Sequence, residues 1–127
     1  MTALATVTRV YQALGAGDLD TLGQLLGDTH WEEAQGGPYG GTYRGAEEIA
    51  GNVFRPIRSD VRNFSGRPDE LLPIGEDRVL ALGRYRGETD RGPLDIRFAH
   101  LWTVADDRIR HFEQFTDTHQ WHAAVGQ

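Results

Sequence analysis

Glu33 and His100 are the two residues whose type and predicted placement could carry acid–base chemistry. Side chains alternate between the faces of a strand. Along residues 94–104 this alternation groups His100 with Leu94, Ile96, Phe98, Trp102 and Val104. Along residues 30–34 it places Glu33 on the face of Trp31. A Glu–His pair in an apolar cavity is suited to moving a proton between two positions on a substrate.

A carboxylate on an inner face needs compensation. An ionised carboxylate among apolar groups is strongly unfavourable unless it is paired or hydrogen-bonded, so Glu33 requires a partner or a raised pKa. His100 is the most obvious inward partner. The alternative is structural: His100 is a core histidine with its hydrogen bonds satisfied, and Glu33 bends out to solvent.

The segment 108–116 reads as a strand that could present either face to a pocket. One face carries Phe112, Gln114 and Thr116, and the other would bring Glu113 and Asp117 inward at electrostatic cost. We favour the first face and interpret Asp117 as the cap of a final helix. The expected ligand-binding residues are therefore Trp31, Tyr43, Phe98, Trp102, Phe112, Gln114 and Thr116.

The composition excludes several kinds of chemistry. The 127 residues include no Cys, and all 13 basic residues are Arg. Thiol nucleophiles, thiolate zinc sites, Schiff-base lysines and P-loop lysines are thus ruled out. His119 and His122 are spaced to share a helix face, but without an evident third ligand we favour a surface role. We expect neither a cofactor nor a metal.

Charge and hydropathy limit the partners. The formal net charge of −6 argues against nucleic-acid binding, which needs a basic face. No apolar run approaches the roughly 20 residues that span a bilayer, and the first residues do not resemble a signal peptide. We therefore expect a cytoplasmic protein with no membrane contact, folded as one domain over residues 1–127.

The elements that must position these side chains follow a simple order. Apolar spacing of three and four predicts helices early in the chain, and alternation predicts strands later. A glycine-rich segment, residues 35–41, reads as a mobile loop. Helices first and an antiparallel meander afterwards indicate an α+β fold. The expected helices cover residues 4–14, 19–26, 45–57 and 118–125, and the expected strands 30–34, 61–65, 70–73, 79–86, 94–104 and 108–116.

Several motifs in this order resemble one family. They are residues 11–18 (YQALGAGD), residues 43–45 (YRG), residues 98–104 (FAHLWTV) and residues 107–109 (DRI). Together they resemble the SnoaL-like, ketosteroid-isomerase-related group of the nuclear-transport-factor-2-like superfamily. The resemblance implies a cystatin-like, cone-shaped α+β barrel: a curved, mainly antiparallel sheet wrapped around the N-terminal helices. It also implies an apolar pocket and a homodimer formed through the sheet.

The resemblance also implies roles for single residues. It places the isomerases' proton-shuttling carboxylate at Glu33 and their second oxyanion donor at His100. Their oxyanion-binding tyrosine corresponds to Val10, and Tyr11 is one residue off, about 100° around the helix. The acidic residue of the SnoaL-like cyclases corresponds to Thr116, next to Asp117. This pattern implies a base with an altered oxyanion site, so steroid isomerisation in the strict sense is not expected.

The sequence thus predicts a cofactor-independent enzyme of isomerase, cyclase or lyase type that acts on a small apolar carbonyl compound. Glu33 would abstract a proton next to the carbonyl, and His100 would hydrogen-bond the enolate or return the proton. The alternative is a non-catalytic ligand-binding or dimerisation module, since fold does not fix function. A third possibility is an epoxide-hydrolase-like protein, but Arg97, which its Asp–Arg–Asp arrangement would need, falls on the outward face.

Overall fold

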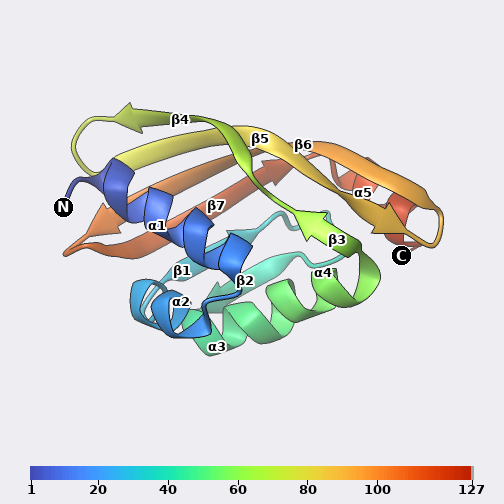
Figure 1. The fold of residues 1–127 in the computed structure, drawn as a ribbon, viewed down its shortest axis with the longest axis horizontal. Helices are drawn as coiled ribbons and strands as arrows, with labels where there is room; N and C mark the ends of the chain where they lie inside the picture. The colour runs from blue at the N-terminus through green and yellow to red at the C-terminus, as the bar shows by residue number, and fades with distance from the viewer. Residues whose placement is uncertain (127) are drawn as a thin grey trace.

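A curved, open sheet of seven strands holds the N-terminal helices against its concave face (Figure 1). The computed structural model describes residues 1–126. The strand order is β2-β1-β7-β6-β5-β3, with β4 also paired to β5. The strands are β1 (His30–Glu33), β2 (Gly41–Arg44), β3 (Arg62–Ser65), β4 (Pro68–Ile74), β5 (Arg78–Thr89), β6 (Gly92–Ala105) and β7 (Arg108–Thr116). The predicted α+β class and curved-sheet architecture are confirmed.

The first helix, α1 (Ala3–Ala16), lies across the concave face of the sheet. Thr2 caps its start by accepting a hydrogen bond from the backbone N–H of Ala5, and Gly17 ends it in the left-handed conformation. Val7 and Val10 are fully buried. This packing orients α1 so that the next residue, Tyr11, reaches toward the middle of the sheet.

The remaining helices close the ends of the sheet's hollow. A nearly continuous helical stretch follows β2: α3 (Gly45–Ile49), a π-helical turn over Ala50–Phe54 and α4 (Arg55–Asp60). Pro56 has no backbone N–H and its ring crowds the preceding turn, which disfavours regular α-helical hydrogen bonding there. The wider π-helical turn lies in this preceding segment. The other helices are α2 (Leu19–Leu25), capped by Asp18, and α5 (Thr118–Val125), capped as predicted by Asp117.

Strand register brings the inward side chains into rows. On β1, β7 and β6, Trp31 lies beside Phe112, and Phe112 lies beside Trp102. One row further along, Gln114 lies beside His100. The parallel pairing of β1 with β7 therefore joins the first strand of the chain to the last and places Glu33 near Gln114.

Two local expectations need correction. β2 (Gly41–Arg44) pairs antiparallel with β1, so the loop expected over residues 35–41 ends one residue earlier, before Gly41. The link between the two longest strands is also shorter than residues 87–93, because β5 and β6 continue pairing as far as Thr89 and Gly92. Within residues 1–126, no helix is long and apolar enough to cross a membrane.

Candidate functional site

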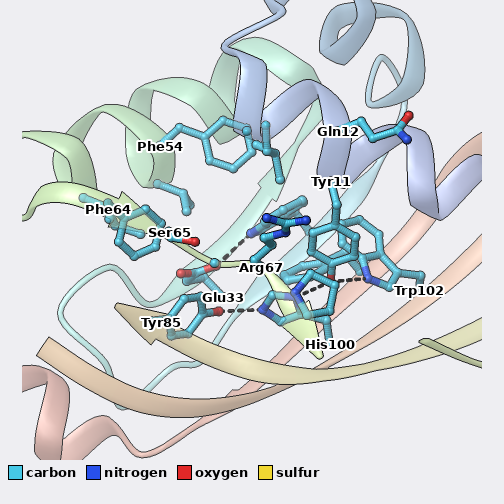
Figure 2. Close-up of a pocket in the computed structure, with 18 of the residues that line it drawn as sticks. Tyr11, Gln12, Glu33, Phe54, Phe64, Ser65, Arg67, Tyr85, His100 and Trp102 are labelled. Carbon is cyan, nitrogen blue, oxygen red and sulfur yellow. Dashed lines mark hydrogen bonds between the residues drawn. The ribbon is translucent and has the colours of Figure 1, made fainter. Parts of the chain in front are cut away.

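A cavity of about 640 Å³ lies between α1, the π turn with α4, the segment joining β3 to β4, and the concave face of the sheet. Its volume falls in the range of small-molecule sites. Figure 2 shows Glu33, Tyr85, His100, Tyr11 and Trp102 gathered on one side of this cavity, with Phe54 on the opposite side. Phe64 stacks on Tyr85 at the end of this polar row. Glu33 is the one carboxylate among the lining residues of the described chain.

Glu33 ends β1 with its side chain on the cavity side. It is only 4% exposed, and the indole Nε1 of Trp31 donates to its Oε1 at 2.9 Å. Burial raises the pKa of Glu33 to about 7, although hydrogen bonds from Trp31 and Gln114 act in the opposite direction. A carboxyl with this pKa can both take and return a proton near neutral pH.

His100 lies on the central strand β6, between two tyrosines. The hydroxyl of Tyr11 is 2.6 Å from its Nδ1, and the hydroxyl of Tyr85 is 2.6 Å from its Nε2. Burial lowers the pKa of His100 to about 3. The imidazole is therefore neutral at physiological pH, with one nitrogen that donates and one that accepts.

Each tyrosine also accepts a hydrogen bond at its other side. The indole Nε1 of Trp102 donates to Tyr11 at 2.9 Å, and Nε2 of Gln114 donates to Tyr85 at 2.8 Å. Burial raises the pKa of both phenols well above the usual range. Both tyrosines thus remain protonated and can serve as hydrogen-bond donors.

The network contains more hydrogen-bond donor hydrogens than there are hydrogen bonds between its residues. The two tyrosines, neutral His100, Trp102 and Gln114 carry six donor hydrogens. Gln114 directs one of them to Glu33, which leaves five for the four contacts. Neutral His100 accepts from one tyrosine and donates to the other. The tyrosine that receives this bond already accepts one from Trp102 or Gln114, so its own hydrogen is unused. Because Tyr11 and Tyr85 both line the cavity, either tautomer leaves one phenolic donor for a ligand.

Gln114 links Glu33 to this network. Its Oε1 accepts from the backbone N–H of Ala34 at 2.9 Å, which fixes the orientation of the amide. Its nitrogen then faces both Tyr85 and Glu33. Within residues 1–126, no hydrogen bond joins Glu33 directly to His100, so the expected Glu–His pair is replaced by a connection through Gln114 and Tyr85.

The structure places five of the predicted site residues in the cavity lining. These are Glu33, His100, Trp31, Trp102 and Phe112. The three aromatic residues pack together, with Trp31 stacked on Phe112 at a ring separation of 3.7 Å. This stack forms the apolar floor beside the polar network.

Four predicted ligand-binding residues lie outside the lining, which corrects the expected pocket wall. Phe98 stacks against the ring of His100 at 3.9 Å, and Gln114 is turned toward Glu33 and Tyr85. The Tyr43 hydroxyl donates to main-chain carbonyls at Tyr39 and Gly40. Thr116 donates to the carbonyl of Arg97 and borders a separate hollow.

Tyr11 and Tyr85 are the site residues that sequence reasoning missed. Tyr85 shares a strand face with Val79 and Ala81, and all three are buried, so alternation along 79–86 could have found it. The offset of Tyr11 from the family position made it a poor candidate. Its long side chain nevertheless reaches His100 and Trp102 from α1 (Figure 2).

The exposed charged residues of the cavity lining are basic, in a protein with a net charge of −6. Arg58 and Arg67 are both among the lining residues. Both arginines are exposed, and Arg58 also donates to the carbonyl of Leu14 at 3.2 Å. An anion entering the cavity would pass these two guanidinium groups.

Comparisons with solved structures define the class of protein. An NTF2-like protein from Burkholderia thailandensis is 35% identical, with a TM-score of 0.89 over 98% of this chain and 97% of that one. An NTF2-like protein of unknown function from Burkholderia pseudomallei is 26% identical, with a TM-score of 0.86 and complete coverage of both chains. TerC, co-crystallised with polyporic acid, is 21% identical, with a TM-score of 0.79 over 98% of each chain. The fold is thus that of the NTF2-like proteins.

The sequence defines the family within this class. The pattern of the SnoaL-like domain matches residues 7–112, which include the whole polar network except Gln114. This chain belongs to the SnoaL-like family. A comparison with curated proteins found no match.

Proposed function

We propose that this protein is a cofactor-independent enzyme that transfers a proton next to a carbonyl group, in a reaction of isomerase, cyclase or lyase type. One observation carries the proposal. A buried carboxyl with a pKa near 7 shares an apolar cavity with a network that leaves one phenolic donor unused. A base and an oxyanion donor are the two groups that enolate formation requires.

The reaction begins when ionised Glu33 removes a proton from the carbon next to the carbonyl. The C–H electron pair forms a carbon–carbon double bond, and the carbonyl electrons move to oxygen. The enolate oxygen accepts a hydrogen bond from Tyr11 or Tyr85. Protonated Glu33 then returns the proton to another carbon in an isomerisation. In a cyclisation, the enolate carbon instead attacks a second carbonyl carbon of the same substrate. The π electrons of that carbonyl move to its oxygen, which takes the proton from Glu33.

His100 serves as a positioning residue in this scheme. Both of its ring nitrogens are engaged by tyrosines, so the imidazole does not itself bind the enolate. Its tautomer decides which phenol keeps a free hydrogen. Burial holds the pKa of His100 near 3, so the imidazole carries no positive charge at neutral pH. Burial also raises the pKa of both tyrosines, so the phenols stay neutral.

The substrate we propose is a small, largely apolar carbonyl compound that carries an anionic group. Apolar side chains such as Val53, Phe54 and Ile57 line much of the cavity, and Arg58 and Arg67 stand at its entrance. The carbonyl end would lie against the sheet, and the anionic group would remain near the arginines. The complex of TerC with polyporic acid gives a precedent for an organic ligand in this fold.

Hydrogen exchange in heavy water tests the proposal without a known product. A panel of small ketones with anionic substituents is incubated with the protein, and loss of the proton signal next to the carbonyl is followed by NMR. We expect faster exchange with the wild type than with Glu33→Gln, by a factor of about 10² to 10⁴. Equal exchange by the two proteins across the panel contradicts the proposal.

A non-catalytic ligand-binding module is the second candidate. It is favoured by the complete satisfaction of both His100 nitrogens, which is also what a stable polar core requires. The same panel separates the two functions. A binding module would bind the ligands equally well as wild type and as the Glu33→Gln variant, and neither protein would accelerate hydrogen exchange.

A further inference from the structure

Three potential metal ligands converge on the outer face of the sheet, opposite the cavity. His30 and Glu32 are two residues apart on β1 and therefore share a face. His111 on β7 lies beside His30 in the parallel register. Trp31, between His30 and Glu32, and Phe112, next to His111, point the other way into the core. A rigid strand pair thus holds two imidazoles and one carboxylate together.

The three side chains are close enough to share one ion. Their nearest ligand atoms all lie within 4.8 Å of one another, and Nε2 of His111 is 2.5 Å from Oε2 of Glu32. The rings of His30 and His111 are 5.2 Å apart at 48°. Nitrogen and oxygen ligands bind zinc at about 2.0–2.2 Å, which in a tetrahedral site places them roughly 3.3–3.5 Å apart. Small side-chain rotations therefore suffice to form a site.

We propose that His30, Glu32 and His111 bind a divalent transition-metal ion, with Zn²⁺ as the best match. Two neutral imidazoles and a carboxylate are a common zinc donor set, and a site of three protein ligands leaves a position for water. The side chains of His111 and Glu32 are 33% and 39% exposed, so an ion can enter from solvent. In the metal-free protein, Glu32 and His111 bond to each other.

Neighbouring charges on the same face both favour and disfavour the binding of a cation. Glu113 lies beside Glu32 in the β1–β7 register and adds a second carboxylate near the site. Arg44 lies beside His30 in the β1–β2 register and adds a positive charge. Replacing Glu113 by Gln should weaken Zn²⁺ binding slightly, and replacing Arg44 by Gln should strengthen it slightly. The ligand set itself should dominate.

The proposal is tested by titrating Zn²⁺ into the untagged, EDTA-treated full chain by calorimetry. We expect one ion per chain, with affinity reduced at least tenfold by His30→Gln and by His111→Gln, and reduced by Glu32→Gln. The double variant His119→Gln/His122→Gln is the matched control, because it removes the other closely spaced histidines and should bind like the wild type. Circular dichroism confirms that each variant is folded.

A second measurement locates the ion independently of any variant. Ni²⁺ should broaden the imidazole NMR signals of His30 and His111 selectively, and leave those of His119 and His122 sharp. The proposal is overturned if the wild type binds no Zn²⁺, or if binding survives His30→Gln and His111→Gln. Binding that disappears only in the His119/His122 control overturns it as well.

Discussion

The hydroxyl of Tyr85 lies 2.6 Å from Nε2 of His100 on the neighbouring strand. With Tyr11 on the other ring nitrogen, this contact satisfies the imidazole and transfers the role of hydrogen-bond donor to a phenol. In the proposed reaction, the donor to the enolate is therefore not His100, which the sequence pattern selects. It is one of the two tyrosines that enclose this histidine.

The two tyrosines should be partly redundant. Removing one hydroxyl leaves the other able to accept from His100 and to donate into the cavity. Tyr11→Phe and Tyr85→Phe should therefore each reduce the exchange rate modestly, by about tenfold, whereas the double variant should lose more than the product of the single effects. Steady-state exchange rates of the four proteins measure this coupling.

Tyr43→Phe is the matched control for these substitutions. It removes a hydroxyl that bonds to main-chain carbonyls outside the lining, so exchange should be unchanged. If the double variant of Tyr11 and Tyr85 behaves like this control, the phenols do not stabilise the enolate.

Glu33 and His100 should give the stability of the protein an unusual pH dependence. The pKa of Glu33 is raised from 4.5 to about 7 in the folded state, so stability falls as pH rises from 4.5 to 7. The pKa of His100 is lowered from 6.5 to about 3, so stability falls as pH drops from 6.5 toward 3. Each effect approaches about 1.4 kcal/mol per pH unit. The two offset each other between pH 4.5 and 6.5.

Urea unfolding at a series of pH values, in EDTA, checks these signs. Because the two effects offset each other between pH 4.5 and 6.5 in the wild type, Glu33→Gln should replace this flat region by a stability that rises with pH up to 6.5. His100→Asn should instead leave a stability that falls steadily as pH rises from 4.5 to 7 and that is lost less on the acid side. Parallel curves for wild type and Glu33→Gln would show that Glu33 has an ordinary pKa in the folded protein.

Gln114 should support both the fold and the base. Gln114→Leu leaves the backbone N–H of Ala34 without its acceptor and Tyr85 without one donor. We expect a loss of about 1–3 kcal/mol in the free energy of unfolding, measured by urea titration. Glu33 loses a hydrogen bond that lowers its pKa, so this pKa should rise further. A variant as stable as wild type, with an unchanged Glu33 pKa, would contradict the proposed link.

Arg67 should select for charge at the entrance. Arg67→Ala should weaken the binding of anionic ligands several-fold and leave neutral ligands of the same shape unaffected, because the guanidinium contributes mainly electrostatic attraction. The difference should shrink as salt is raised. Calorimetry with matched carboxylate and amide ligands measures it, and equal losses for both ligands would show that Arg67 acts through packing instead.

Periodicity predicted the fold and the inward faces well. Residues 108–116 and 118–125 form the expected strand and helix, and Trp31, Glu33, His100 and Trp102 all point inward. Alternation assigns a face but not the lateral register of strands distant in sequence. Alternation therefore could not predict the β1–β7 pairing, which brings Gln114 between Glu33 and Tyr85.

The misplaced expectations have a related cause. Helical spacing locates a Cα atom but not how far a long side chain extends, so the reach of Tyr11 to His100 was overlooked. Thr116 was assigned to the inner face by alternation, but its hydroxyl is held by Arg97 on the neighbouring strand β6. The outer group of His30, Glu32 and His111 depends on the same unforeseen strand pairing.

The most direct test of the account is the titration of the Glu33 carboxyl carbon by ¹³C NMR in the unliganded, EDTA-treated protein. The proposed base is a buried carboxyl that is half-ionised near neutral pH, so the predicted midpoint is about pH 7. A midpoint near the ordinary value of 4.5 would mean that Glu33 is solvated or strongly paired, and would contradict its role as the base.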